Sequence, residues 1–290
     1  MKKIGFVGLG NMGSKMVINL LKANYEVFGY DINENFTNSL VPSGLKKVSS
    51  LTDLSTDIDI LITMLPNGEI VESVYDNIIN NFKKNTLFTD CSTIDVDKAK
   101  YLHEKCNKSG LLSLDAPVSG GVGGAEAGSL TFMVGGNHNA YEKMLPLFEV
   151  MGSKSVLCGP PGSGQATKAC NNMLLATTMI SVGETLRLAS KLGLDSKKLF
   201  EILSTSTGSC WAVNNYFPVE GIGPKSPADN NFQPGFSAKL MLKDLTIALK
   251  AIADTKTSAP FGSKAQKNFK KMVESNEGEL DFSAITRYNK

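Results

Sequence analysis

The segment KIGFVGLGNMG, residues 3–13, joins a short apolar run to a glycine-rich turn with the spacing G-x-G-x-x-G. A helical pattern from about Asn11 to Lys22 follows, and a second apolar run over 26–30 ends at Asp31. A strand, this turn, a helix and an acidic residue about 20 residues further on make up the fingerprint of a dinucleotide-binding unit. The segment therefore predicts a nucleotide-binding β-α-β unit in this part of the chain.

The glycines of the turn and Asp31 each predict a contact with the cofactor. Gly8 permits a tight turn, Gly10 lets the backbone approach a pyrophosphate, and Gly13 lets the helix pack closely on the strand. The free N–H groups at the helix N-terminus favour the phosphates. The Asp31 carboxylate can accept hydrogen bonds from ribose hydroxyls and would repel a 2′-phosphate, and residues 32–45 contain no Lys or Arg. We therefore expect NAD rather than NADP.

Apolar runs extend this organisation through the first half of the chain. Further strands are expected at 58–64, 86–90, 111–115, 130–134 and 155–158, with helical patterns near 69–80 and 95–108. Strands that alternate with helices are typical of a parallel sheet covered by helices on both faces. Residues 1–162 are therefore expected to form an α/β domain, a doubly wound sheet of the Rossmann type that binds the dinucleotide.

The remainder of the chain has a different character. After GPPGSG at 159–164 no strand is expected, and a helical pattern about 29 residues long covers 164–192. Gly193 fits the C-terminal stop of this helix, and Asp195 or Ser196 can cap the next one. Further helices are expected at 197–204, 237–255 and 263–274. Residues 163–290 are therefore expected to form an all-α domain, organised around one long helix, for substrate binding and oligomerisation.

The composition narrows the class of protein. The 290 residues are 42% hydrophobic and 20% charged with a net charge of +2, which is typical of a globular protein and favours neither nucleic acid nor a membrane as partner. Arg187 and Arg287 are the only arginines, which further disfavours a nucleic-acid reader. His103 and His138 are the only histidines, so neither a histidine zinc site nor a Ser-His-Asp triad is expected.

The cysteines and the N-terminal segment bear on the compartment. The 5 cysteines are dispersed without a C-x-x-C pair, which predicts reduced thiols. The chain runs directly into its first strand pattern, with no leader pattern ahead of it. We therefore expect a cytoplasmic protein.

Three further segments, together with the glycine-rich turn, resemble the β-hydroxyacid dehydrogenases over essentially the whole chain. They are DAPVSGGVGGAEAG at 115–128, GSGQATKACNN at 162–172 and FSAKLMLKDL at 236–245. The first is similar to the substrate-binding segment of that family, the second to the segment with its catalytic lysine, and the third to its L-M-x-K-D-L helix. Within the family, the chain is most similar to the 3-hydroxyisobutyrate dehydrogenases.

The resemblance implies roles for the first two of these segments. Lys168 is the expected catalytic group, and its position in a mainly apolar helix predicts burial that lowers its pKa toward that of a useful base. Asn172, one helical turn further on, is expected to face the cleft between the domains with it, and to bind the substrate or hold the lysine. Ser119 and the backbone N–H groups of Gly120 and Gly121 form a receptacle suited to a small carboxylate.

Further cofactor contacts are expected where strands end, because cofactors lie at the carboxyl ends of strands in open α/β sheets. The resemblance implies such contacts at Leu65, Pro66 and Thr93, and at Lys243 beside the nicotinamide. Asp244 is expected either to pair with a neighbouring cation or to belong to the site. The full set of expected cofactor contacts is Gly8, Leu9, Gly10, Asn11, Met12, Gly13, Asp31, Leu65, Pro66, Thr93 and Lys243.

The expected reaction is the NAD-dependent oxidation of a short 3-hydroxy acid, namely 3-hydroxyisobutyrate to methylmalonate semialdehyde, a step of valine catabolism. Ser119 and the following amides hold the carboxylate, Lys168 accepts the hydroxyl proton, and a hydride passes to the nicotinamide. No metal is required, because a protonated Lys168 can stabilise a developing alkoxide.

Two other hypotheses about the function remain open. One is an NAD(P)H-dependent reductase of succinic semialdehyde, glyoxylate or tartronate semialdehyde. The other, in a different class, is an NAD-sensing or scaffold protein on the same fold. A homodimer or homotetramer is expected in each case, because so apolar a long helix seldom faces water.

Overall fold

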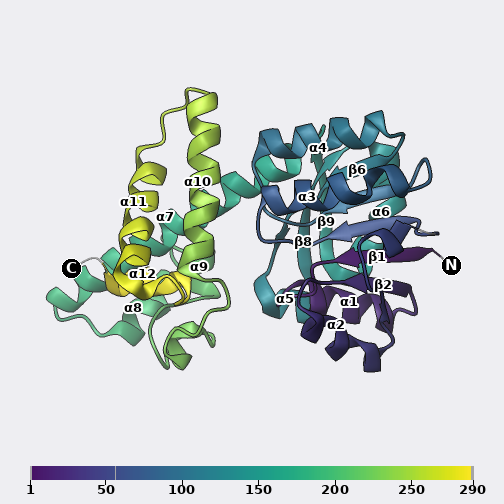
Figure 1. The fold of residues 1–290 in the computed structure, drawn as a ribbon. Coiled ribbons are helices and arrows are strands. Elements are labelled where there is room, and N and C mark those ends of the chain that lie inside the picture. Colours follow the sequence, from purple (N-terminus) through teal and green to yellow (C-terminus); the bar gives the residue numbers. More distant parts are fainter. Residues whose placement is uncertain (1, 56, 289–290) are drawn as a thin grey trace. The chain divides into compact units, whose positions relative to one another are not determined.

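The computed structural model describes residues 2–55 and 57–288 of the chain (Figure 1). The chain divides into two compact units, residues 1–168 and 169–290. The division falls inside one long helix, α7 (Ser163–Lys191). The boundary expected from the sequence, after Gly162, lies at the start of this helix.

The described residues of unit 1 are built on a sheet of nine strands. They are β1 (Lys3–Val7), β2 (Glu26–Tyr30), β3 (Lys46–Lys47), β4 (Ile60–Thr63), β5 (Leu87–Asp90), β6 (Leu112–Asp115), β7 (Val118–Ser119), β8 (Leu130–Gly136) and β9 (Gly152–Gly159). The first six lie in the order β3-β2-β1-β4-β5-β6, and each neighbouring pair among them is parallel. This is the strand order of doubly wound dinucleotide-binding sheets, so the predicted fold class is confirmed.

The far edge of the sheet corrects the expectation of a purely parallel sheet. β8 runs antiparallel to both β6 and β7, and β9 pairs parallel with β8. The segment between β7 and β8 holds only the short helix α5 (Gly121–Ala127) and a few flanking residues. That is shorter than the dozen or so residues that a parallel crossover requires, and the chain therefore returns antiparallel.

Helices cover both faces of this sheet (Figure 1). They are α1 (Gly13–Lys22), α2 (Glu34–Leu40), α3 (Gly68–Ile78), α4 (Val96–Lys108), α5 and α6 (His138–Met151). One apolar cluster joins α1, α5 and α6 to the sheet, and a second joins α3 and α4 to it. Along β1, Ile4 and Phe6 belong to the first cluster and Val7 to the second, as the alternation of side chains along a strand requires.

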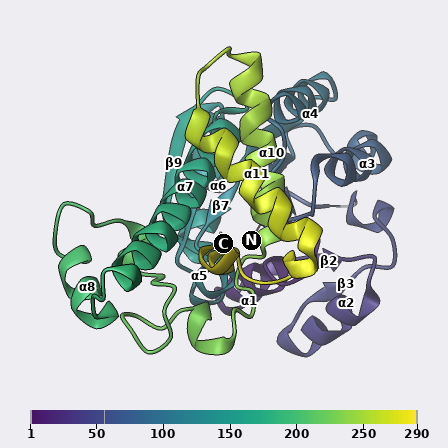
Figure 2. The ribbon, with the colours of Figure 1, turned by 90° about the vertical axis from the view of Figure 1, so that its left-hand side faces the viewer.

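Unit 2 is helical. Its helices after α7 are α8 (Ser196–Leu203), α9 (Trp211–Asn214), α10 (Ala238–Asp254), α11 (Pro260–Met272) and α12 (Ile285–Tyr288). Among its described residues the only β pairing is an isolated bridge between Ser237 and Asp281. Helices α10 and α11 lie side by side (Figures 1 and 2) and share an apolar cluster with α7. The predicted all-α part of the chain is confirmed.

The long helix and its end agree with the sequence prediction. α7 has 29 residues and begins and ends one residue before the predicted positions. Gly193 has φ +73°, the left-handed conformation that ends helices, and the Asp195 side chain accepts a hydrogen bond from the Lys198 N–H to cap α8. No helix of the described residues is long and apolar enough to cross a membrane.

Candidate active site

The glycine-rich turn between β1 and α1 has the geometry that a dinucleotide requires. Gly8 has φ +93°, and a Cβ there would overlap the carbonyl oxygen of Met64. A Cβ on Gly13 would overlap the carbonyl oxygen of Gly8, whereas one on Gly10 would meet no described atom within 4 Å. No described side chain caps α1, and its first turn has no acidic residue. The turn therefore fits a pyrophosphate, which the N–H groups of a helix N-terminus bind well.

Asp31 adjoins this turn. It follows β2 directly, and its Oδ2 accepts a hydrogen bond from the Leu9 N–H at 2.7 Å while its Oδ1 accepts one from the Asn33 N–H at 2.8 Å. A carboxylate oxygen can accept more than one hydrogen bond, so Asp31 can also accept hydrogen bonds from ribose hydroxyls. The residues present fit an adenosine next to the pyrophosphate turn.

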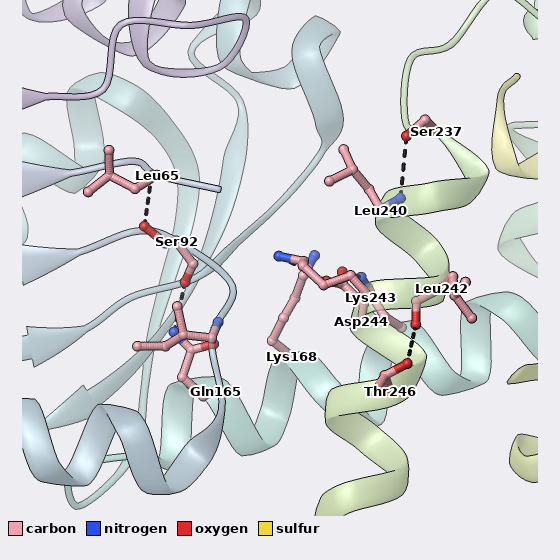
Figure 3. A network of polar contacts seen from close by, with 12 residues as sticks. Leu65, Ser92, Gln165, Lys168, Ser237, Leu240, Leu242, Lys243, Asp244 and Thr246 are labelled. Atoms are coloured by element: carbon pink, nitrogen blue, oxygen red, sulfur yellow. Dashed lines mark hydrogen bonds and ion pairs between the residues drawn. The ribbon is translucent and has the colours of Figure 1, made fainter. Parts of the chain in front are cut away.

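The loops after β4 and β5 are joined to each other by Ser92. Its Oγ accepts a hydrogen bond from the Leu65 N–H at 2.8 Å (Figure 3). The same Oγ donates a hydrogen bond to Asp90 Oδ1 at 2.6 Å. Thr63 also donates to Asp90 Oδ1, at 2.7 Å. The predicted contacts Leu65 and Pro66 thus lie in a loop that is bonded to the loop of Thr93, and their contact with cofactor stays a prediction.

Lys168 lies in the second turn of α7 and is buried, with 7% of its surface exposed. Its Nζ donates a hydrogen bond to the carbonyl oxygen of Val118 at 2.7 Å. Val118 and Ser119 form β7, so the amine is held one residue away from the predicted carboxylate-binding serine. Two segments that are 50 residues apart in sequence are thereby brought together.

The backbone of the turn after Ser119 favours glycine. Gly120 has φ +130° and Gly121 φ +62°, both in the left-handed region. α5 begins at Gly121 with no side-chain cap from the described residues. The turn therefore agrees with the predicted role of the Gly120 and Gly121 amides, which stays a prediction.

Asp115, at the end of β6, belongs to this region, and no role was predicted for it from the sequence. Its Oδ1 accepts a hydrogen bond from the Gly162 N–H at 2.8 Å, and its Oδ2 accepts one from the Gln165 N–H at 2.9 Å. A Cβ on Gly164 would lie 2.6 Å from the Asp115 carbonyl oxygen, so the start of α7 approaches β6 closely only with glycine there. The available signal was an acidic residue at the end of a buried apolar strand.

Burial raises the pKa of Asp115 to about 6, against the lowering effect of the hydrogen bonds from Gly162 and Gln165. The folded protein therefore binds this proton more tightly than the unfolded chain, in which the carboxyl has its ordinary pKa near 3.8. The contribution of Asp115 to the free energy of unfolding therefore increases as the pH falls through about 6, and it levels off below about 4.

The Asp115→Asn variant has no such proton to lose, and this predicts a pH-dependent difference between the two proteins. The free energy of unfolding of the wild type minus that of the variant should increase from about pH 7 to about pH 4, by on the order of 3 kcal/mol. Denaturant unfolding of both proteins at each pH measures the difference. A difference that is constant, or that decreases toward acid pH, would show that the pKa of Asp115 is not raised.

Gln165 is a second residue for which no role was predicted from the sequence. Its side chain is fully buried, its Nε2 donates to the Ser92 carbonyl oxygen at 2.8 Å, and its Oε1 accepts from the Ile94 N–H at 3.1 Å (Figure 3). The signal in the sequence was its place in GSGQATK, three residues before Lys168. Its partners lie more than 70 residues away in sequence, and no local pattern reveals them.

In unit 2, the predicted residues Asn172 and Lys243 both contact Asp244. Asn172 donates a hydrogen bond from Nδ2 to Asp244 Oδ2, and both side chains are buried. Lys243 Nζ lies 3.4 Å from Asp244 Oδ1. Of the two expectations for Asp244, pairing with a neighbouring cation is confirmed. The roles of Asn172 toward substrate and of Lys243 toward cofactor stay predictions.

The part of the chain that the structure describes contains no cluster of three or more His, Cys, Asp or Glu residues that could hold a metal ion.

Two family models together match nearly the whole chain. The NAD-binding domain of 6-phosphogluconate dehydrogenase matches residues 3–159, and the NAD-binding model of NADP-dependent 3-hydroxyisobutyrate dehydrogenase matches residues 162–289. The two models meet close to the start of α7.

Curated proteins and solved structures are similar to this chain over almost its full length. A probable 3-hydroxyisobutyrate dehydrogenase of Mycobacterium tuberculosis is 44% identical over 285 residues, which are 98% of this chain and 97% of the relative. An NAD-dependent L-serine dehydrogenase of Pseudomonas aeruginosa is 41% identical over 290 residues, 99% of this chain and 97% of the relative. A structure of Mycobacterium tuberculosis 3-hydroxyisobutyrate dehydrogenase with L-serine has a TM-score of 0.94 at 43% identity, covering 99% of this chain and 98% of that one.

Proposed function

The chain belongs to the 3-hydroxyisobutyrate dehydrogenase family of NAD-dependent β-hydroxyacid dehydrogenases, and on this premise we propose that it oxidises 3-hydroxyisobutyrate to methylmalonate semialdehyde. The observation that supports the proposal most strongly is the hydrogen bond from Lys168 to the Val118 carbonyl. It holds a buried amine beside Ser119, where a group that accepts a proton and a group that binds a carboxylate are both needed.

In the proposed reaction, Ser119 and the amides of Gly120 and Gly121 hold the substrate carboxylate, and Lys168 takes the proton of the hydroxyl group. NAD, when bound, accepts the hydride from the carbinol carbon, so that alcohol becomes aldehyde. A carbonyl oxygen can accept a hydrogen bond from an ammonium or from an amine. Val118 can therefore hold Lys168 in both of the protonation states that a proton transfer requires.

The proposed cofactor site combines the turn, the carboxylate and the strand ends described above. The amides of the turn bind the pyrophosphate, and Asp31 binds the adenosine ribose. The part of the cofactor that lies across the strand ends is bound by Leu65, Pro66 and Thr93. Asn172 is proposed to contact the substrate and Lys243 the cofactor. The turn residues in this proposal are Gly8, Leu9, Gly10, Asn11, Met12 and Gly13.

L-Serine is the second candidate substrate. A relative at 41% identity is named an NAD-dependent L-serine dehydrogenase, and the structure at TM-score 0.94 is of a complex with L-serine. L-Serine and 3-hydroxyisobutyrate share the carboxylate and the carbinol group at the same separation, and they differ in an ammonium group against a methyl group. The proposed roles of Ser119 and Lys168 apply to both acids.

A comparison of kcat/KM across small hydroxy acids with NAD tests the proposal. The set is 3-hydroxyisobutyrate, L-serine, glycerate, tartronate and 4-hydroxybutyrate, and the reverse reaction is measured with succinic semialdehyde, glyoxylate and tartronate semialdehyde. We expect the largest value with 3-hydroxyisobutyrate and a small one with 4-hydroxybutyrate, whose carbinol carbon lies one carbon further from the carboxylate. A larger value with L-serine would identify the second candidate. No turnover with any of them would contradict the proposal and favour an NAD-sensing protein.

We further propose that residues 1–162 bind the cofactor and that 163–290 serve substrate binding and oligomerisation, in a cytoplasmic homodimer or homotetramer acting in valine catabolism. The support for an oligomer lies in unit 2, where large apolar side chains are exposed on α7 and α8. Leu174, Leu188 and Ile202 are each more than 60% exposed. Exposed apolar side chains of this size are typical of surfaces that contact another subunit. Light scattering on the purified chain distinguishes a monomer from either oligomer.

A further inference from the structure

Gln165 joins two parts of unit 1 that carry different elements of the proposed site. Its side chain bonds to the backbone on both sides of Thr93, since it donates to the Ser92 carbonyl oxygen and accepts from the Ile94 N–H. Its own backbone N–H donates to Asp115 Oδ2. One residue thus holds the loop after β5 against the first turn of α7.

The bonded path continues in both directions from Gln165. On one side, Ser92 Oγ accepts a hydrogen bond from the Leu65 N–H, so the loop after β4 belongs to the same network (Figure 3). On the other side, Lys168 follows Gln165 by three residues on the same helix, and its amine bonds to Val118. The loops proposed to contact the cofactor are therefore connected to the proposed catalytic amine by a few backbone-directed hydrogen bonds.

The site requires a side chain that donates one hydrogen bond and accepts another. The site offers one acceptor, the Ser92 carbonyl, and one donor, the Ile94 N–H, and both lie in a fully buried environment. Only a side chain with a donor and an acceptor at its end satisfies both, and a buried backbone group without a partner costs about 1–3 kcal/mol. If the side chain only filled space, a methionine would serve equally well, because it has a similar volume.

We propose that Gln165 is a positioning residue, which couples the loop of Thr93 to α7 and thereby sets the place of Lys168 relative to a cofactor bound at that loop. The inference rests on the proposed function for the role of Lys168. In this proposal Gln165 acts through the backbone of two elements and touches neither substrate nor cofactor.

Two substitutions separate positioning from packing. Gln165→Met retains the volume and removes both hydrogen bonds. Gln165→Glu retains the acceptor for Ile94, and in its protonated form the carboxyl O–H also donates to the Ser92 carbonyl oxygen. When ionised, it places a carboxylate oxygen against that carbonyl oxygen instead. Gln266→Met, on α11, is the matched control for a Gln-to-Met change outside this network.

The kinetic expectation follows from a displaced Lys168. In Gln165→Met, kcat should fall about 10- to 100-fold, because a displacement of about 1 Å at a reacting group has effects of this size. The dissociation constant of NADH should change by less than about threefold, because the glycine turn and Asp31 are unaltered. In Gln165→Glu, the ratio of kcat to that of the wild type should increase as the pH falls, whereas for Gln165→Met this ratio should not depend on pH. The control should retain the wild-type kcat.

Amide hydrogen exchange in the absence of substrate and cofactor tests the same coupling without reference to activity. The Ile94 amide and the amides of residues 166–168 should exchange faster in Gln165→Met than in the wild type, by about fivefold or more, since one hydrogen bond contributes about 1 kcal/mol. The control variant should leave these amides unchanged.

The two measurements fail in distinguishable ways. Unchanged exchange in Gln165→Met, or a wild-type kcat in that variant, would overturn the positioning role. A Gln165→Glu to wild-type ratio that is independent of pH would overturn it too. If the wild type turns over no hydroxy acid, the proposed function fails, and faster exchange at Ile94 and at 166–168 would still establish that Gln165 couples the loop to the helix.

Discussion

The Lys168→Ala variant is expected to bind NADH as tightly as the wild type while its kcat falls by about 100- to 10,000-fold, the range that positioned general acid–base groups contribute. The reason is that the variant lacks the buried amine that lies at the Val118 carbonyl, next to Ser119. Initial rates with the preferred hydroxy acid, together with NADH fluorescence titrations, measure both quantities.

Two further lysine variants show whether the fall in kcat is due to the loss of proton transfer. Lys168→Arg keeps a positive charge and a hydrogen-bond donor, but a guanidinium does not release its proton in a protein. It should therefore be nearly as inactive as Lys168→Ala if proton transfer is the function of the residue. Lys191→Ala, in the last turn of the same helix, is the matched control and should retain the wild-type rate. Near-normal turnover in Lys168→Ala would exclude the residue as the proton acceptor.

The Asp31→Ala variant should also show a large effect, a fall in kcat/KM with NAD of about 10- to 100-fold. Asp31 is tied by both oxygens to the backbone near the glycine turn, where the ribose of a bound NAD is proposed to lie. Hydrogen bonds from ribose hydroxyls to a charged group contribute about 1.5–3 kcal/mol each. Measurement of kcat/KM with NAD and with NADP, in the wild type and in the variant, tests this.

The same variant should shift the choice between the two cofactors. The negative charge of Asp31 disfavours a 2′-phosphate, so its removal should lower the NAD to NADP ratio of kcat/KM mainly through loss of NAD activity. Asp31→Asn removes the charge and retains one acceptor, and it should shift the ratio in the same direction. Asp254→Ala, at the exposed end of α10, controls for the loss of a carboxylate elsewhere. A wild type that prefers NADP would contradict the role given to Asp31.

The features that the sequence predicted correctly are those that local patterns determine. Gly8 and Gly13 are required by their close backbone neighbours. The glycine spacing, together with the strand before it, the helix after it and Asp31, therefore identifies the turn. The length of α7 follows from an uninterrupted helical pattern that ends at Gly193. The alternation of strands with helices likewise predicted the doubly wound sheet.

The features that were missed depend on contacts between distant segments or on exceptions to local rules. No helix was predicted over 138–151, yet α6 forms there with Pro146 inside it, a residue that usually breaks helices. Its stability comes from packing, because Met144, Leu147 and Phe148 are buried in the apolar cluster of unit 1. The antiparallel edge at β8 depends in the same way on the short connection to β7, which the spacing of apolar runs does not specify.

The site shows the same division. Lys168, Ser119 and Asp31 belong to motifs and could be named from the sequence, whereas Asp115 and Gln165 bond to residues roughly 50 to 70 positions away. Hydrogen bonds of a buried carboxylate and a buried amide to backbone groups have no sequence signature of their own. Only the folded structure identifies these partners.

The central claim is that this chain removes a hydride from the carbinol carbon of a short 3-hydroxy acid and that Lys168 takes the hydroxyl proton. It is tested most directly by incubating the wild type and Lys168→Ala with NAD and 3-hydroxyisobutyrate deuterated at the carbinol carbon. Mass spectrometry of the reduced cofactor then reports the isotope that was transferred. We predict one deuterium in the NADH formed by the wild type and almost no reduced cofactor with the variant. NADH without deuterium, equal yields from both proteins, or no NADH from the wild type would contradict the account.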